Sequence, residues 1–148
     1  MNHLQVAREF TFQFLFHFQL AHSEENRDDL KNLDQIGLTN KINELKETTG
    51  HMLNDQGNTF ALNHIQATLD HYTDAADIVR KHLKNWKLER LSKVDHTLLI
   101  LAIVEMYFTK KAPAKVIMNE SIELAKKYGS KESPAFINGV LDSAAKEL

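Results

Sequence analysis

The sequence contains no cysteine, only two prolines and five glycines in 148 residues, and no apolar run long enough for a membrane span. The lack of cysteine excludes disulfides, thiolate nucleophiles and Cys-ligated zinc. It is consistent with a protein of a reducing compartment. Few helix-interrupting residues favour a mostly helical chain. Residues 1–22 hold one Arg and one Glu, which does not resemble a secretory signal. We therefore expect a soluble, cytoplasmic protein that makes no contact with a membrane.

The lack of cysteine and the small number of glycines also argue against catalysis. The five glycines form no phosphate-binding loop, and no Gly-x-Ser-x-Gly elbow is present. Eight histidines invite a metal site, but none stands three residues after a glutamate and no His-Glu-x-x-His occurs. We expect surface histidines, no metal, no cofactor and no enzymatic activity.

What the chain does contain is an uneven distribution of charge. The formal net charge is only −2. Residues 23–78 hold eleven Asp and Glu against four Lys and Arg, a net charge of −7. Residues 79–148 hold thirteen Lys and Arg against eight Asp and Glu, a net charge of +5. This asymmetry indicates either a polyanionic or acidic partner for the second half or attraction between the halves.

The N-terminal segment has phenylalanine at every second position from Phe10 to Phe18, which is a strand pattern. No neighbouring segment could pair with such a strand, and Leu15 joins the apolar residues of one helical face. We therefore predict a helix with two apolar ridges, the second formed by Phe12, Phe16 and Leu20. Three roles are open for that second ridge: it belongs to the core, to a dimer surface or to a surface that binds a partner.

The remaining pattern predicts helices throughout. We expect a polar segment from Ser23 to a break at Gly37, helices over 40–54 (capped by Thr39) and 59–72, and a turn at 57–58. A helix over 75–86 follows, restarted at 73–74. Ser92-x-x-Asp95 caps a helix that is apolar on all sides to Phe108 and therefore buried. Pro113 and Ser133-Pro134 open the last two helices, with Gly139 at a close helix–helix contact.

Together these elements predict an all-α protein of about seven helices and no sheet, with residues 1–148 as one domain. We expect an N-terminal subdomain of about residues 1–73 and a C-terminal subdomain of about residues 74–148.

Basic residues are the best candidates for a binding surface. A helix would align Arg80, Lys84 and Lys87 on one face, and further lysines surround Pro113. Single-stranded RNA is bound by cations for phosphates and by flat side chains for bases. A solvated basic face is the alternative interpretation.

Four blocks of the second half carry a resemblance to a known family. They are Asn85-Trp86-Lys87-Leu88-Glu89-Arg90-Leu91-Ser92-Lys93-Val94-Asp95, Pro113-Ala114-Lys115-Val116-Ile117-Met118-Asn119-Glu120, Glu123-Leu124-Ala125-Lys126-Lys127-Tyr128-Gly129 and Phe136-Ile137-Asn138-Gly139-Val140-Leu141-Asp142. In content and order they resemble the C-terminal half of the NusB transcription antitermination factors. Ala7-Arg8-Glu9, followed by Gln13, is similar to the opening of that family's first helix.

The resemblance implies two packed helical subdomains and a complex with the small-subunit ribosomal protein that doubles as NusE. It further implies binding of boxA-type single-stranded RNA and action on the transcription elongation complex at ribosomal RNA operons. The positions implied for RNA are Arg8, Gln13, Phe16, Lys115, Lys131, Glu132 and Phe136. Those implied for NusE are Glu89 and Asp95.

The chain departs from the family at its N-terminus. The family's arginine-rich lead-in is replaced by Met1-Asn2-His3-Leu4-Gln5-Val6, and a frequent tyrosine is replaced by Phe16. Each lost phosphate contact lowers RNA affinity and its salt dependence. An alternative function is therefore a NusB-fold protein-interaction module, or a homodimer, with little RNA binding. The NusB-like domain of an RNA methyltransferase would require a glycine-rich cofactor domain, which we do not expect here.

Overall fold

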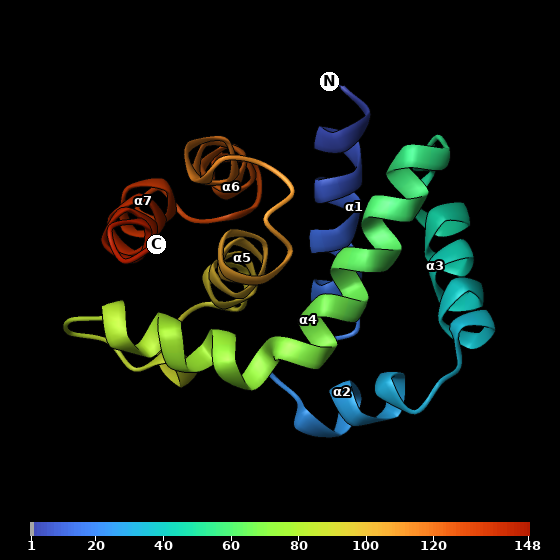
Figure 1. Cartoon of the computed structure of the whole chain (residues 1–148), viewed down its shortest axis with the longest axis horizontal. Helices are drawn as coiled ribbons and strands as arrows, with labels where there is room; N and C mark the ends of the chain where they lie inside the picture. The colour runs from blue at the N-terminus through green and yellow to red at the C-terminus, as the bar shows by residue number, and fades with distance from the viewer. Residues whose placement is uncertain (1) are drawn as a thin grey trace. The chain divides into compact units, whose positions relative to one another are not determined.

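The structure of the protein is a computed structural model that describes residues 2–148 (Figure 1). Within this range it contains seven α-helices, one 3₁₀ turn, one π-helical turn and no strand. In chain order they are α1 (His3–His17), α2 (Glu24–Lys31), α3 (Gln35–Thr49), α4 (Asp55–His82), η1 (Leu88–Arg90), α5 (Lys93–Val104), η2 (Glu105–Thr109), α6 (Ala114–Tyr128) and α7 (Ser133–Ala145). The predicted all-α class with about seven helices is confirmed.

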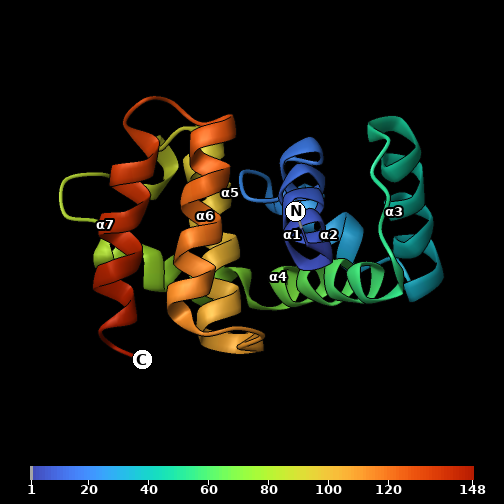
Figure 2. The same ribbon diagram turned by 90° about the horizontal axis from the view of Figure 1, so that it is seen from above.

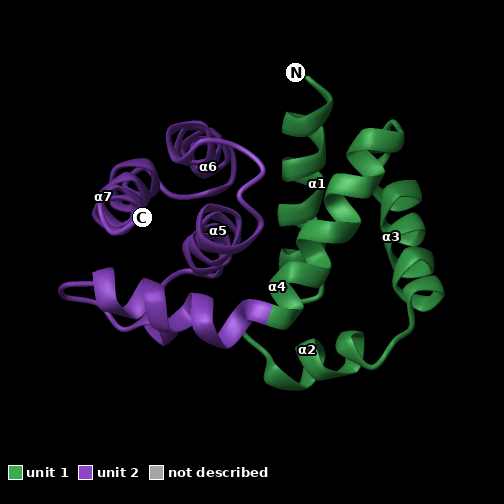
Figure 3. Cartoon of the chain, viewed as in Figure 1, with its two compact units in different colours: residues 1–70 green, residues 71–148 purple. Residues whose placement is uncertain are grey.

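The chain divides into two compact units (Figure 3). Unit 1 spans residues 1–70 and holds α1, α2, α3 and the first part of α4. Unit 2 spans residues 71–148 and holds the rest of α4 and the helices that follow. Over residues 2–148, no helix combines the length and the apolar character that crossing a membrane requires.

Helix α5 is the centre of unit 2. Every residue from His96 to Val104 is buried, as predicted for a helix that is apolar on all sides. Ser92 caps the helix, because its Oγ accepts a hydrogen bond from the Asp95 N–H at 3.1 Å. Helices α6 and α7 pack against α5 and against each other (Figure 2). Burying each Leu or Ile of α5 contributes about 1.5–3 kcal/mol.

The aromatic N-terminus is helical, as predicted, and its two ridges differ. Phe10 and Phe14 on the first ridge are fully buried. On the second ridge Phe12 is buried, whereas Phe16 is 39% exposed and stacks on Phe12 with ring centres 5.7 Å apart. Leu20 is buried but lies beyond the end of α1. The second ridge is therefore core at two positions and surface at Phe16.

The expected boundaries between residues 34 and 59 were wrong. Helix α3 starts at Gln35, because Asp34 Oδ1 accepts the N–H of Gly37 at 2.7 Å. Helix α4 starts at Asp55, because Asn54 Oδ1 accepts the N–H of Gly57 at 2.8 Å. Each glycine lies three residues after an Asp or Asn cap, inside the first helical turn rather than in a break. Ser23 does cap α2, as expected.

Helix α4 is continuous through residues 73–74, where a restart was expected, and it ends at His82 rather than near residue 86. Lys84 and Lys87 consequently lie beyond the helix, and the predicted basic face with Arg80 does not form.

Three histidines expected on the surface, His64, His82 and His96, are buried. The ring of His82 contacts Ser143 Oγ at 2.8 Å and Glu147 Oε2 at 3.1 Å, which provides the polar partners that burial requires.

The glycine at a close contact is Gly129, not Gly139. A Cβ atom at position 129 would lie 2.6 Å from both Cβ and Oγ of Ser133 and 2.9 Å from the Ala125 carbonyl oxygen. At Gly139, in α7, a Cβ atom would meet nothing within 4 Å. The predicted helix–helix contact at Gly139 was therefore wrong.

A π-helical turn, η2, follows α5 directly. The Lys110 N–H donates to the carbonyl of Glu105, five residues earlier, at 2.7 Å. Within this turn Tyr107 Oη donates to the Ala144 carbonyl oxygen at 2.7 Å, and the Phe108 ring stacks on His71 with centres 4.2 Å apart. Wide turns of this kind are rare and often lie near functional positions.

Candidate RNA-binding and partner-binding surfaces

Arg8, the basic residue predicted to grip phosphate from α1, is only 8% exposed. Its guanidinium carbon lies 4.9 Å from the centre of the Phe60 ring, within the range of a cation–π contact. Both residues belong to unit 1. Arg8 is thus placed in the interior of its unit and presents little of its charge to solvent.

Gln13 and Phe16 lie further along α1. Gln13 Oε1 is hydrogen-bonded to the His51 ring, which follows the end of α3. Phe16 exposes 39% of its surface while its ring is held by Phe12. A supported aromatic ring with an open side can stack on a nucleobase. Of the three positions predicted in unit 1, Phe16 is the most accessible.

In unit 2, Lys115 lies in the first turn of α6 and is exposed. Pro113 precedes this turn with a β/extended backbone, and Val116 and Ile117 donate to its carbonyl oxygen at 3.0 and 3.2 Å. An exposed ammonium beside the positive end of a helix attracts anions. Among residues 2–148 no ion pair joins Lys115 to a carboxylate, so its ammonium group can contact a phosphate directly.

Lys131, Glu132 and Phe136 lie where the loop after α6 enters α7. Lys131 and Glu132 are exposed, and Phe136 is half-buried in the first turn of α7. Ser133 holds the loop, because its Oγ accepts the Ser130 N–H at 3.0 Å while it packs against Gly129. Because Gly129 has no side chain, Ser133 can pack closely against it, and this contact helps to position the loop that carries Lys131 and Glu132.

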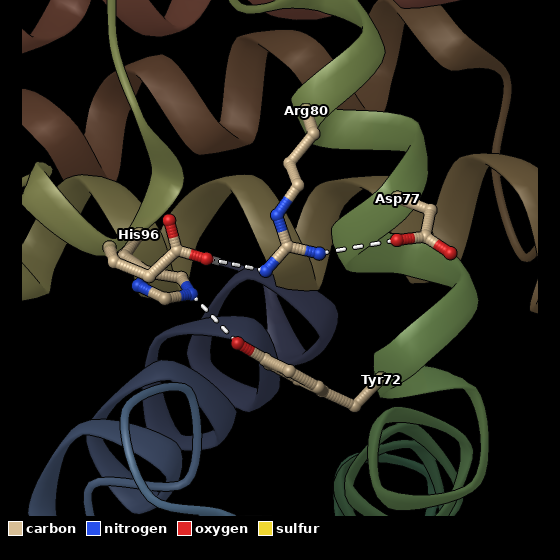
Figure 4. A network of polar contacts seen from close by, with 5 residues as sticks. Tyr72, Asp77, Arg80 and His96 are labelled. Atoms are coloured by element: carbon tan, nitrogen blue, oxygen red, sulfur yellow. Dashed lines mark hydrogen bonds and ion pairs between the residues drawn. The ribbon is translucent and has the colours of Figure 1, made fainter.

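The two acidic positions predicted for NusE lie in unit 2. Glu89, in η1, accepts a hydrogen bond from Arg80 Nη2 at 2.6 Å, and Arg80 Nη1 contacts Asp77 at 3.2 Å (Figure 4). The Arg80 hydrogen bond lowers the pKa of the Glu89 carboxyl, and Glu89 raises that of Arg80. The Glu89 side chain remains 62% exposed, so a basic partner can still reach it.

Asp95 follows Glu89 in the first turn of α5. Its backbone N–H is capped by Ser92, but its buried Oδ1 atom has no hydrogen-bond partner among residues 2–148. Beside it His96 Nε2 shares a 2.9 Å hydrogen bond with Tyr72 Oη (Figure 4). Burying a carboxylate oxygen without a hydrogen bond is costly. The residue as a whole is half-buried, so part of it remains at the surface.

The predicted RNA positions fall into two groups. Arg8, Gln13 and Phe16 belong to α1 in unit 1, whereas Lys115, Lys131, Glu132 and Phe136 belong to α6, α7 and the loop between them in unit 2. One exposed residue was missed: Trp86, which is 61% exposed in the loop after α4. We expected it inside a helix, although its position between Lys84 and Lys87 was a visible signal.

Comparison with known proteins gives consistent matches along nearly the whole chain. The family model described as the NusB family matches residues 5–146. The transcription antitermination protein NusB of a Nitratiruptor species is 33% identical over 142 residues, covering 96% of this chain and 91% of the relative. A solved structure of T. maritima NusB has a TM-score of 0.78 at 29% identity, covering 99% and 92% of the two chains. The structure of antitermination factors NusB and NusE in complex with dsRNA has a TM-score of 0.78 at 23% identity, covering 100% and 99%, and this likeness concerns the fold.

Proposed function

The chain belongs to the NusB family, and we propose that it is a cytoplasmic transcription antitermination factor that pairs with NusE and binds boxA-type single-stranded RNA. The observation that carries the proposal is the match to the NusB family over residues 5–146, which is nearly the whole chain. The mechanism is recognition and tethering: the protein holds nascent RNA and NusE at the elongation complex, and no bond is made or broken.

For the RNA we propose contacts from Arg8, Gln13, Phe16, Lys115, Lys131, Glu132 and Phe136. Phe16 supports this role because it is a held ring with an open side, and Phe136 offers a second ring. Lys115 and Lys131 are exposed cations for phosphates, and the Glu132 carboxylate can accept from base amino groups. Arg8 and Gln13, which have partners within unit 1, contribute less.

For NusE we propose the carboxylates of Glu89 and Asp95, both in unit 2. Glu89 is exposed, and Asp95 Oδ1 has no partner among the described residues. Charged rim groups of this kind raise the association rate and select a basic partner. We further propose that units 1 and 2 correspond to the two subdomains expected at about residues 1–73 and 74–148.

A second candidate function is a NusB-fold protein-interaction module or homodimer with little RNA affinity. Two observations favour it: residues 1–7 contain no Lys or Arg, and Arg8 is 8% exposed. The chain therefore offers less exposed positive charge at the start of α1 than its resemblance implies.

One titration separates the two functions. Labelled boxA RNA is titrated with the protein, with and without NusE, across a salt series. We expect binding that is strengthened by NusE and weakened by salt, because phosphate contacts release counterions. If no binding is observed at low salt in the presence of NusE, the RNA-binding function is wrong and the interaction module is the better description.

A further inference from the structure

The loop that joins α4 to η1 presents the only tryptophan of the chain to solvent. Trp86 is 61% exposed, and its neighbours Lys84, Asn85 and Lys87 are exposed as well. In Figures 1 and 2 this loop extends beyond the helices of unit 2. A large ring left in water is unusual, because burying it would be favourable, and tryptophan is enriched where partners bind.

The loop is fixed at both ends. On its N-terminal side His82 is 8% exposed and is held by Ser143 and Glu147. On its C-terminal side Leu88 is 1% exposed, and the Arg90 N–H donates to the Lys87 carbonyl oxygen at 3.0 Å. Only about five residues separate these anchors, so the loop has little freedom to bury Trp86 elsewhere.

The charge around Trp86 identifies the class of ligand. Residues 80–93 contain six Lys and Arg and a single acidic residue, Glu89, which is paired with Arg80. Lys81 is paired with Glu147. Within the described range of residues 2–148, no ion pair joins Lys84 or Lys87 to a carboxylate. The two cations that flank the ring are thus available for an anion.

We propose that Trp86 is a stacking platform for a base of single-stranded RNA, with Lys84 and Lys87 contacting the adjoining phosphates. An exposed flat ring between free cations is the combination that binds single strands with little sequence preference. Lys84 and Lys87 attract an anionic strand to the ring, whereas the Glu89 carboxylate, which we propose for NusE, is paired with Arg80 and follows three residues after Trp86. The inference rests on the proposed RNA-binding function and adds a contact to it that lies outside the seven positions assigned above.

The single tryptophan provides a direct test, because all indole fluorescence comes from this loop. The full chain, with and without NusE, is titrated with a labelled single-stranded RNA of about 12 nucleotides. RNA anisotropy and Trp86 emission are recorded together. We expect quenching of the emission over the same concentrations at which the anisotropy rises.

Substitutions measure the contribution of the ring. Trp86→Ala should weaken RNA binding at least about fivefold, whereas Trp86→Phe should retain most of the affinity because a flat ring remains. Ile36→Ala is the matched control: this apolar side chain is 72% exposed in α3, in the acidic part of the chain. Circular dichroism checks that each variant is folded. The quenching experiment uses the wild-type chain, so it tests the proposal even if a variant does not fold.

The other outcomes overturn the inference in distinguishable ways. If RNA binds normally without quenching and Trp86→Ala has no effect, the platform is wrong and the proposed function stands. If NusE alone quenches Trp86 and Trp86→Ala weakens only NusE binding, the ring is a protein anchor instead. If no RNA binds at low salt with NusE present, both the platform and the proposed RNA-binding function are wrong.

Discussion

Nη2 of Arg80 lies 2.6 Å from Oε1 of Glu89, so this carboxylate, which we assign to NusE binding, already has a cation of its own chain beside it. The pair joins the last turns of α4 to η1. Because the carboxylate is 62% exposed, the arginine orients it without covering it. A basic partner would therefore compete with Arg80 for Oε1 of Glu89, whereas it could form a hydrogen bond with Oε2 without displacing Arg80 from Oε1.

Charge reversal at the proposed NusE surface should weaken the complex. Glu89→Lys and Asp95→Lys should each reduce NusE affinity by about three- to tenfold, mainly through slower association, because an attractive rim charge becomes repulsive. Surface plasmon resonance with immobilised NusE measures both rates. The loss should shrink at higher ionic strength.

The control for this pair is Glu123→Lys in α6, where an exposed carboxylate pairs with Lys126 at 3.0 Å. It changes the net charge by the same amount but lies outside the proposed surface. If the control weakens NusE binding as much as Glu89→Lys does, the effect is one of overall charge and the assignment is wrong.

The Arg80–Glu89 pair should make stability depend on pH in a defined window. The hydrogen bond from Arg80 lowers the pKa of Glu89 in the folded state. Its contribution is therefore complete above the ordinary glutamate pKa of about 4.3 and is lost as the pH falls through the lower folded-state value. Wild type should be more stable than Glu89→Gln at pH 7, and the difference should vanish in acid. Urea denaturation at a series of pH values measures it.

A double-mutant cycle provides the control for this pH dependence. In an Arg80→Gln background, Glu89→Gln should have almost no pH-dependent effect, because the cation that lowers the pKa is absent. A wild-type advantage that persists unchanged to pH 3 would show that Glu89 acts through something other than its ionised carboxylate.

Two glycine substitutions should change stability in opposite directions. Gly129→Ala places a Cβ atom 2.6 Å from Ser133 and 2.9 Å from a backbone oxygen, and should destabilise the protein by about 1–3 kcal/mol. Gly139→Ala meets nothing within 4 Å inside an exposed part of α7, and should stabilise it by up to about 1 kcal/mol. Chemical denaturation compares both with wild type. Equal effects of the same sign would contradict the assignment of the close contact to position 129.

Lys115 and Lys131, two exposed lysines among the positions that we propose for RNA, should contribute to the salt dependence of RNA binding. Lys115→Gln and Lys131→Gln should each reduce the slope of log affinity against log salt by about 0.7, the value for one contact to a single strand. Lys31→Gln in α2, also exposed, serves as the control and should leave the slope unchanged. Anisotropy titrations at four or more salt concentrations measure it. A reduction in all three variants would indicate a general effect of charge.

Much of the fold could be predicted because local signals and burial agree there. Helix α5 combines a Ser92 cap with a continuous apolar run, and both lead to a buried central helix. The region around Gly37 and Gly57 was mispredicted because a glycine three residues after an Asp or Asn resembles a turn in composition. In the structure, the cap oxygen accepts the N–H of that glycine and starts a helix.

The candidate site was less predictable, since it depends on tertiary packing. Nothing in the sequence around Arg8 shows that Phe60 lies beneath its guanidinium, and nothing in it shows that Gly129 rather than Gly139 is the crowded position. The exposure of Trp86 follows from the end of α4 at His82, whose partners Ser143 and Glu147 lie 61 and 65 residues further along the chain. Contacts at such separations leave no periodic trace in the local sequence.

The wide turn η2 makes the chain sensitive to deletion. Its five-residue hydrogen bond from Lys110 to Glu105 contains one residue more than an ordinary helical turn. Removing one residue would restore a regular helix but rotate everything after it by about 100°. Tyr107 would then lose Ala144, and Phe108 would lose His71. Both contacts therefore depend on the length of this turn as well as on the side chains of Tyr107 and Phe108.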